Sequence, residues 1–479
     1  MDFPQILVLL LIAAAYLLVI PSQWRSWALM VVSVVAIYWL QPTISVRWLD
    51  YSLPTATLLL TIVCWWISKP SETRRPAPQD TLAGAIIVGI VLLLALARYV
   101  QLPQALELTS RPPEIFGIII AMVLALGIAV SVRQFTGSRS IAIGLVVVMG
   151  LLIVMQTPPL AGALSGVFRG QSGQDVSLAS SIDLNWLGFS YVAFRLTHTL
   201  RDRQTGILPD LSLRDYVTYV VFAPAYASGP IDRVERFAED LSSLPTMKAL
   251  NSQRITLAFS RIGVGMFKKF VIADSLAVFS LDAVNATQSV NAGATWVMLY
   301  TYGFRLFFDF SGYSDIAIGI GMLFGIQLRE NFDRPYLKNN ITAFWQAWHM
   351  SLTNWVRFYI FSPLSRNLLR REPKPSNEVI MFICHLSTMM IIGLWHSVTL
   401  TFLLWGLWHG LGLWLHKLWS DRTRKWYMGL KNTPRRKQAW TFAGWFLTFH
   451  FVMLGWVWFS MPSVDMALSV FARLLGVGR

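Results

Sequence analysis

Cysteine and charge are both scarce in this chain. Only two of its 479 residues are cysteines, Cys64 and Cys384, and both fall in apolar segments. Two cysteines cannot build a disulfide framework, and no cysteine–histidine spacing matches a structural zinc site, so we expect no metal centre. Charged residues make up 14% of the chain, whereas a soluble domain carries about a quarter. The composition therefore excludes an ordinary soluble protein.

Apolar residues take the place of the missing charge and form 55% of the chain. Many of them lie in uninterrupted runs close to the roughly 20 residues that cross a bilayer as a helix. The clearest runs are Ile6–Ile20, Trp27–Leu40, Leu82–Val100, Ile115–Val132, Ile141–Met155 and Trp440–Phe459. With the weaker segments included, the sequence predicts an all-α polytopic membrane protein of about 11 to 13 embedded helices.

Acidic residues are outnumbered, with 25 Asp and Glu against 40 Lys and Arg, which gives a net charge of +15. In a soluble protein such an excess would suggest nucleic-acid binding. In a membrane protein it has a simpler cause, because basic residues collect in the loops that stay cytoplasmic. We therefore expect no nucleic-acid partner and assign the basic loops Arg201–Arg214, Arg366–Lys374 and Lys417–Lys437 to the inside. The loops Gln41–Asp50 and Gln156–Asp183 then fall outside, as does the N-terminus.

Polar side chains divide the chain in two, and no internal repeat is visible. Residues 1–184 are predicted to form plain transmembrane helices, whereas residues 185–479 carry charged and polar groups within or beside the apolar runs. Polar groups at membrane depth are tolerated only where protein or a water-filled cavity lines them. We therefore predict a core at 185–479 that encloses a cavity, with the helices of 1–184 packed around it. Asp309 and Asp315 are costly at that depth, so we expect each to be paired with Lys or Arg.

One histidine lies in the aromatic segment FWQAWHMSLTNWVRFY, residues 344–359. Gln346, His349, Thr353 and Arg357 are spaced three, four and four residues apart, so they would share one face of a helix. The Arg within this helix and the basic residues on both sides of it favour a re-entrant or interfacial helix beside the cavity. The alternative is a Trp-rich interface anchor whose histidine hydrogen-bonds a backbone carbonyl.

A second histidine lies where two apolar stretches meet. Val379–Trp395 and Thr399–Leu415 are separated by His396, Ser397 and Val398, so His396 is predicted at a break between two helices. A buried, neutral imidazole suits proton abstraction near neutral pH. The alternative is a core histidine satisfied by a helix-terminal carbonyl.

The other histidines carry weaker signals. His409 and His416 lie seven residues apart on one predicted helix, which would suit a pair of metal ligands. Histidines are common at membrane interfaces, however, and we expect no metal there. His198, His385 and His450 are expected to be structural.

Several segments, in order along the chain, resemble one enzyme family. The longest are residues 307–364, which begin FFDFSGYSDIAIG, and residues 393–411, GLWHSVTLTFLLWGLWHGL. Shorter ones are GFSYVAFR at Gly188–Arg195, FAPAYASGPIDRVERF at Phe222–Phe237 and GMFKKFVIA at Gly265–Ala273. Over about 185–475 the chain resembles the membrane-bound O-acyltransferase (MBOAT) superfamily. The resemblance is to its bacterial polymer-modifying branch, which includes the membrane subunit of alginate O-acetylation and the protein that passes D-alanine to teichoic acids.

This resemblance implies a fold and a division of roles. The fold is a funnel-shaped helical enzyme with a tunnel that joins the two sides of the membrane. His396 takes the place of the family's near-invariant histidine, and His349 that of the second one. Acyl transfer needs a general base for the attacking hydroxyl and donors for the developing oxyanion. We expect His396 to be the base, and His349 and Asn340 to orient the donor or stabilise charge.

The resemblance also bears on the acyl donor. Arg357, Lys268 and Lys269 would hold the phosphates of a donor such as acetyl-CoA, although the two lysines equally suit a topology signal. The donor would be a co-substrate, and no tightly bound cofactor is expected. The chain departs from its relatives in two places: it has Arg357-Phe358-Tyr359 where they have Arg-Asp-Tyr, and Ser397 where they usually have Gly.

Together these features predict an O-acyltransferase in the plasma (inner) membrane of a bacterium. It would move an acyl group, acetyl before others, from the cytoplasmic side to a hydroxyl of an exported polysaccharide or cell-wall polymer. An extracytoplasmic acyltransferase or an acyl-carrier partner would complete the transfer if the enzyme does not reach the polymer itself. D-alanyl transfer to teichoic acid is the alternative within the fold. A proton-coupled transporter, which should show an inverted repeat, and a non-catalytic scaffold of a polymer-secretion complex are the alternatives from other classes.

Overall fold

The computed structural model describes residues 1–70, 76–100, 108–110, 112–134, 137–248, 251–289 and 291–477. These residues form helices and no strand, with one isolated antiparallel bridge between Phe332 and Trp348. The prediction of an all-α protein is confirmed. The chain forms two compact units, Met1–Ile262 with Ile316–Arg329 and Gly263–Asp315 with Glu330–Arg479. The functional division at residues 184 and 185 stays a prediction.

Seven helices in the described part of the chain are long and apolar enough to cross a membrane. They are Leu49–Ser68, Pro78–Arg98, Ile115–Val132, Ser138–Gln156, Ala292–Phe324, Asn377–His396 and Pro434–Ser460. Helix α1 (Phe3–Val19) is apolar but shorter. Each of the six apolar runs singled out in the sequence falls mainly within a helix, and together with the apolar spans this confirms a multi-pass membrane protein. The larger number of embedded helices stays a prediction.

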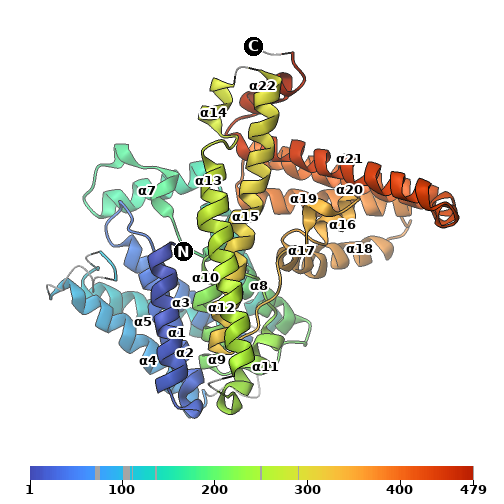
Figure 1. Ribbon diagram of the computed structural model, residues 1–479. Helices are drawn as coiled ribbons and strands as arrows, with labels where there is room; N and C mark the ends of the chain where they lie inside the picture. Colours follow the sequence, from blue (N-terminus) through green and yellow to red (C-terminus); the bar gives the residue numbers. More distant parts are fainter. Residues whose placement is uncertain are drawn as a thin grey trace. The chain divides into compact units, whose positions relative to one another are not determined.

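The first unit holds the helices of the N-terminal half (Figure 1). Among them, α3 packs against α5, α8 and α9, and α6 packs against α8, so α3 lies at the centre of this unit. The α-helices are α1, α2 (Arg25–Leu40), α3 (Leu49–Ser68), α4 (Pro78–Ala95), α5 (Ile115–Gln134), α6 (Gly137–Gln156), α7 (Pro158–Gln171), α8 (Phe189–Gln204), α9 (Leu213–Val220), α10 (Ala223–Tyr226), α11 (Val234–Ser243) and α12 (Ser252–Met266), of which residues 263–266 belong to the second unit. Short 3₁₀ turns are η1 (Ser22–Trp24), η2 (Leu96–Arg98), η4 (Val176–Leu178), η5 (Ser181–Leu184) and η6 (Leu244–Thr246).

A buried polar cluster around Asp183 joins α7, the turn η5 and the segment before α3. Asp183 accepts hydrogen bonds from Arg169 Nε at 2.9 Å and from the hydroxyls of Ser165 and Ser45, each at 2.6 Å. The Arg169 guanidinium holds the pKa of the Asp183 carboxyl well below its usual range, and the two hydroxyls add to this effect although burial opposes it. The folded protein therefore favours the ionised carboxylate.

We predict that Asp183→Asn lowers the melting temperature of the purified protein by a few degrees at neutral pH. Because folding lowers the pKa of Asp183, the stability that the carboxylate contributes is present above its unfolded pKa, about 4, and is lost as the pH falls below that value. The difference between wild type and variant should therefore shrink on acidification from pH 6 towards pH 3. Thermal unfolding followed by tryptophan fluorescence tests this, and a difference that stays constant over that range would contradict it.

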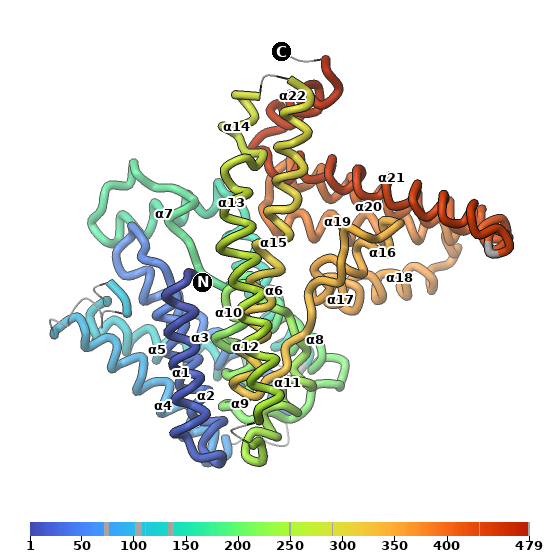
Figure 2. Tube along the Cα trace, in the orientation of Figure 1, coloured from blue at the N-terminus to red at the C-terminus, as the bar shows by residue number. Residues whose placement is uncertain are grey.

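The second unit holds the long helices of the C-terminal half. Figure 1 shows α20 and α21 running alongside each other, and Figure 2 shows α22 near α14. The indole of Trp296, at the start of α15, donates to the Leu474 carbonyl of α22 at 3.1 Å. The α-helices are α13 (Asp274–Ala277), α14 (Ala283–Gln288), α15 (Ala292–Phe324), of which residues 316–324 belong to the first unit, α16 (Ile341–Trp345), α17 (Met350–Val356), α18 (Ser362–Leu369), α19 (Asn377–His396), α20 (Leu400–Gly429), α21 (Pro434–Ser460) and α22 (Val464–Leu474). Two π-helical turns, η7 (Phe267–Ala273) and η9 (Arg357–Phe361), and two 3₁₀ turns, η8 (Pro335–Leu337) and η10 (Leu430–Asn432), complete it.

One predicted loop of this unit is wrong. The sequence assigned Lys417–Lys437 to a loop, but α20 continues as a helix to Gly429 and α21 begins at Pro434. The segment 417–428 contains no Gly or Pro, and its Lys, Arg, Leu and Met residues are good helix formers. Only the short stretch between the two helices is a turn.

Glycines let α19 and α20 pack closely as a hairpin. A Cβ at Gly406 would lie 2.6 Å from the Met389 carbonyl oxygen, and a Cβ at Gly393 would lie 2.3 Å from that of Phe402. Both contacts are with backbone, which cannot move aside as a flexible side chain does. Small residues of this kind allow helix backbones to approach in a membrane, where helix association depends on packing. This hairpin carries His396 at the end of its first helix.

We predict that Gly406→Ala destabilises the protein by about 1–3 kcal/mol through overpacking of the hairpin. The matched control is Gly263→Ala, because a Cβ at Gly263 has nothing within 4 Å. The control should keep or slightly raise the melting temperature in detergent, since Ala favours helix more than Gly does. Equal melting temperatures for the two variants would show that the hairpin is not closely packed.

Candidate active site

His349 lies at a break in the backbone, not within a helix. Helix α16 ends at Trp345, α17 begins at Met350, and His349 has the left-handed backbone angles φ 45° and ψ 52°. The predicted helical face through Gln346, His349, Thr353 and Arg357 is therefore wrong, because Gln346 lies outside the helix that follows. A left-handed conformation is uncommon for residues other than glycine and is often found at functional sites.

The break is held by a neighbouring strand-like segment. The Met350 N–H donates to the Asn331 carbonyl at 2.9 Å, and the Asp333 N–H donates to the Ala347 carbonyl at 3.0 Å. Phe332 and Trp348 form the isolated bridge between these two bonds. A helix through this point would leave those backbone groups without these partners, so the long-range pairing overrides the helical pattern of the sequence.

The His349 side chain is almost fully enclosed, with 4% of its surface exposed. Its ring packs edge-on against Phe310 at 4.7 Å and lies 6.1 Å from Trp395. Its Nε2 atom finds no hydrogen-bond partner among the described residues. Burial lowers the pKa of His349 to about 3, with a smaller effect in the same direction from His396. A buried polar atom without a partner is costly, which is typical of a site that binds something else.

His396 is the last residue of α19, and Ser397 caps that helix through its N–H, which donates to the Gly393 carbonyl at 3.4 Å. Helix α20 begins three residues after Ser397, so the predicted break at His396 is confirmed. The imidazole is half-buried in an aromatic cage. The cage consists of Trp395 at 4.5 Å, Phe459 at 4.8 Å, Phe402 at 5.7 Å and Trp405 at 5.9 Å between ring centroids.

The structure brings the two histidines together through Trp395, whose indole contacts both rings. They come from different elements: His349 precedes α17, and His396 ends α19. Two neutral imidazoles beside one another can accept a proton from a hydroxyl and donate a hydrogen bond to a developing charge. This pair is the candidate active site of the second unit.

The predicted donor-binding residues are placed differently. Asn340 caps α16, since its Oδ1 accepts from the Ala343 N–H at 2.8 Å and its Nδ2 donates to Asn339 at 3.1 Å. Arg357 is exposed at the start of the π-helical turn η9. The structure does not bring Asn340 or Arg357 into a contact with either histidine that can be described, and their roles stay predictions.

Lys268 and Lys269 lie in the other π-helical turn, η7, and both are paired. Lys268 Nζ lies 2.7 Å from Asp315 Oδ2, and Lys269 Nζ lies 2.5 Å from Asp309 Oδ1. This confirms the prediction that the two aspartates of α15 are neutralised by basic residues. π-helical turns are rare and occur frequently at functional sites. A role for these lysines in phosphate binding would require the pairs to open, and it stays a prediction.

His409 is a residue whose environment the sequence did not reveal. It is fully buried, and neither ring nitrogen finds a hydrogen-bond partner within the described chain. Its ring lies 4.9 Å from Trp405, which also contacts His396, and 5.2 Å from Trp345. The signal for His409 in the sequence was its position in an aromatic predicted helix, within the motif LWHG. By contrast His416 has a hydrogen-bond partner, because its Nδ1 atom lies 3.0 Å from the hydroxyl of Thr342.

His450 and His198 have polar partners, and His385 packs against Phe361 with its ring centroid at 5.3 Å. His450 accepts a hydrogen bond from the Tyr300 hydroxyl at 3.0 Å and donates to the Phe446 carbonyl at 2.8 Å. In the first unit His198 pairs with Asp202 at 3.0 Å, and these two with Glu235 form a group of metal-ligand type. Arg233 binds both carboxylates there, at 3.4 Å and 2.5 Å. A guanidinium within the donor set does not fit a cation site, which agrees with the structural role expected for His198.

The chain is similar to proteins that modify cell-surface polymers. The model of the membrane-bound O-acyltransferase family matches residues 113–456. The teichoic acid D-alanyltransferase of Streptococcus thermophilus is 35% identical over 288 residues, which are 58% of this chain and 68% of that protein. The peptidoglycan O-acetyltransferase of Helicobacter pylori is 34% identical over 263 residues, 55% of this chain and 47% of that protein.

A probable alginate O-acetylase of Pseudomonas fluorescens is 31% identical over 293 residues, 61% of this chain and 54% of that protein. The chain thus spans about two thirds of the first relative and about half of the other two. The motifs seen in the sequence begin near residue 185. The family model begins earlier, at residue 113, and it includes both His349 and His396. The chain belongs to the membrane-bound O-acyltransferase family, which confirms the predicted family and its class of enzyme, an acyltransferase.

Proposed function

We propose that this protein transfers an acetyl group from a donor on the cytoplasmic side to a hydroxyl of an exported polysaccharide or cell-wall polymer, in the plasma membrane of a bacterium. Relatives named for the O-acetylation of peptidoglycan and alginate support the acetyl group and the polymer acceptor. An extracytoplasmic acyltransferase or acyl carrier is the partner that would finish the transfer. Acetyl-CoA would serve as donor and co-substrate.

The observation that carries the proposal is the meeting of His349 and His396 at Trp395. The acceptor hydroxyl would lie against His396, whose neutral imidazole takes its proton as the oxygen attacks the acetyl carbonyl carbon. The tetrahedral intermediate then collapses, the C–S bond of the thioester breaks, and the imidazolium returns the proton to the leaving thiolate. His349 would donate a hydrogen bond to the oxyanion from a ring N–H held in place by the fixed backbone.

Other groups near the two histidines would assist. The indole N–H groups of Trp345 and Trp405 are buried and unpartnered in the described residues, so they are available as donors for developing charge. Arg357, exposed at η9, is the cation we propose for the phosphates of the donor, with Lys268, Lys269 and Asn340 in secondary roles.

D-alanyl transfer to teichoic acid is the second candidate. It is favoured by the Streptococcus thermophilus relative, of whose length the chain covers 68%. The same pair of histidines would serve, because the chemistry at the acceptor hydroxyl is unchanged. The two candidates differ in the acid that alkaline hydrolysis releases from the polymer.

We predict that His396→Ala lowers base-labile acyl ester on the cell-surface polymer to the level of a deletion strain, since loss of a general base costs about 10²–10⁴-fold in rate. The ester is quantified after mild alkaline release and identified by mass. Acetate supports the first candidate, and D-alanine supports the second. His385→Ala, on the same helix α19, is the matched control and should keep wild-type ester.

Membrane abundance of each variant is measured beside the ester. If His396→Ala inserts normally and keeps wild-type ester, the base assignment fails, and a scaffold becomes the better explanation. If the ester persists while export of a small solute is lost, a transporter is favoured.

We predict that His349→Asn lowers acyl transfer by about 10²-fold or more while the melting temperature stays within a few degrees of wild type. Asn tolerates the left-handed conformation seen at His349, so the fold is kept while the imidazole is lost. His349→Gly, which also suits that backbone, should behave in the same way. Full activity in either variant would show that His349 has only a structural role, at the break in the backbone, and no role in catalysis.

A further inference from the structure

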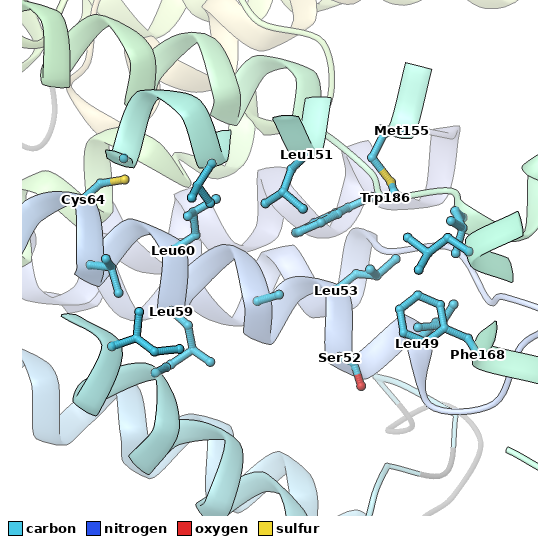
Figure 3. A pocket seen from close by; sticks show the side chains of 18 of the residues that line it. Leu49, Ser52, Leu53, Leu59, Leu60, Cys64, Leu151, Met155, Phe168 and Trp186 are labelled. Carbon is cyan, nitrogen blue, oxygen red and sulfur yellow. The ribbon is translucent and has the colours of Figure 1, made fainter. Parts of the chain in front are cut away.

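A long apolar cavity of about 610 Å³ lies within the first unit (Figure 3). One face of α3 lines it in steps of three and four residues from Leu49 to Ile67, and one face of α6 lines it from Ile143 to Met155. Side chains from α5, α7 and the segment around Trp186 complete the wall. We propose that this cavity binds a long-chain polyprenyl phosphate, with its chain between α3 and α6.

The lining fits a hydrocarbon chain. Aliphatic and aromatic side chains form most of it, and Leu53, Leu60 and Leu151 point into the space in Figure 3. Three of its helices, α3, α5 and α6, are among those that can span the membrane, so the cavity lies at bilayer depth. Within the bilayer the hydrophobic effect does not favour side chains over lipid chains, because both are apolar. An empty cavity lacks van der Waals contacts, and a lipid chain that enters it supplies them.

The polar side chains of the lining gather towards one end. Arg47 precedes α3, Gln171 ends α7, and the Arg47 guanidinium reaches the neighbouring Ser172 carbonyl at 3.4 Å, which places the two segments side by side. The Arg47 side chain is exposed and makes no ion pair with a carboxylate in the described chain. A guanidinium in that state is a ready partner for a phosphate. By the charge pattern of the loops, this end faces the outside.

A strained residue sits at the same end. Trp48, which lines the cavity next to Arg47, has φ 72°, in the left-handed region. For a bulky residue this conformation is an outlier that the surroundings must enforce, and such strain concentrates at binding sites. Its indole provides an amphipathic surface of the kind that occurs where a lipid chain meets its headgroup.

The length of the cavity favours a polyprenyl chain over a phospholipid. The lining face of α3 between Leu49 and Ile67 is about 27 Å long at 1.5 Å per residue, and that of α6 between Ile143 and Met155 is about 18 Å. Half of the hydrocarbon core is about 15 Å thick, and the chains of a phospholipid end there. A chain that fills the cavity must pass the midplane, as a long isoprenoid does. This inference does not rest on the acyl transfer proposed above.

The test uses the full chain, purified in detergent, and thermal unfolding in the presence of added lipid. Polyprenyl monophosphates of increasing chain length are compared with the matching polyprenols and with phosphatidylglycerol. We expect the stabilisation to increase with chain length beyond the length that reaches the midplane. We expect the phosphates to bind roughly tenfold more tightly than the alcohols, since one charge-assisted contact is at stake.

Two substitutions separate the headgroup from the chain. Arg47→Gln should make the polyprenyl phosphate and the polyprenol bind equally tightly, whereas Arg47→Lys should keep a difference in affinity between them. Ala56→Phe lies partway along the lining face of α3 and blocks the deep half of the cavity. In this variant the stabilisation should no longer increase with chain length. Ala121→Phe, on an exposed position of α5 outside the lining, is its control and should behave as wild type. Val147→Phe blocks from the α6 side if Ala56→Phe does not fold.

Three results would overturn the proposal. Stabilisation by phosphatidylglycerol equal to that by the longest polyprenyl phosphate would show that the cavity takes ordinary membrane lipid. No change in the dependence on chain length in both blocking variants would place the chain elsewhere. Equal binding of phosphate and alcohol by the wild type would remove Arg47 from the site.

Discussion

The two backbone hydrogen bonds on either side of His349 are the constraint on which the candidate active site depends. They join residues 347 and 350 to residues 333 and 331, and they hold the histidine in a conformation that the chain alone does not favour. The cost is offset by enclosure, since Phe310 and Trp395 fill the space around the ring. The imidazole is therefore enclosed on two sides, and its partner His396 lies at the end of the first helix of a closely packed hairpin.

A second theme is how an apolar protein keeps charge at depth. In the second unit Lys268 and Lys269 each meet an aspartate of α15, so two charges of each sign cancel locally. An isolated charge in hydrocarbon would cost several kcal/mol. Consecutive residues of a regular α-helix point about 100° apart, yet Lys268 and Lys269 of the π-helical turn both reach carboxylates of α15.

Much of this could be predicted from the sequence, for identifiable reasons. Apolar runs predicted helices because membrane helices satisfy their own backbone, and the residues His396, Ser397 and Val398 between two apolar stretches predicted the break at His396. The cost of a buried carboxylate predicted that Asp309 and Asp315 would be paired. The break at His349 could not be predicted, because no Gly or Pro marks it and its cause lies some sixteen residues away, at the bridge to Phe332. The cavity beside α3 was equally hidden, since that helix is apolar on several faces.

The hairpin of α20 and α21 is longer than the hydrocarbon core of a bilayer is thick. At 1.5 Å per residue, helices of 30 and 27 residues measure about 45 and 40 Å, against about 30 Å of hydrocarbon. The charged residues between Lys417 and Lys437 decide which end protrudes. The turn near Gly429 must stand clear of the acyl chains, as a rigid basic arm within reach of anionic lipid headgroups and of the water beyond them.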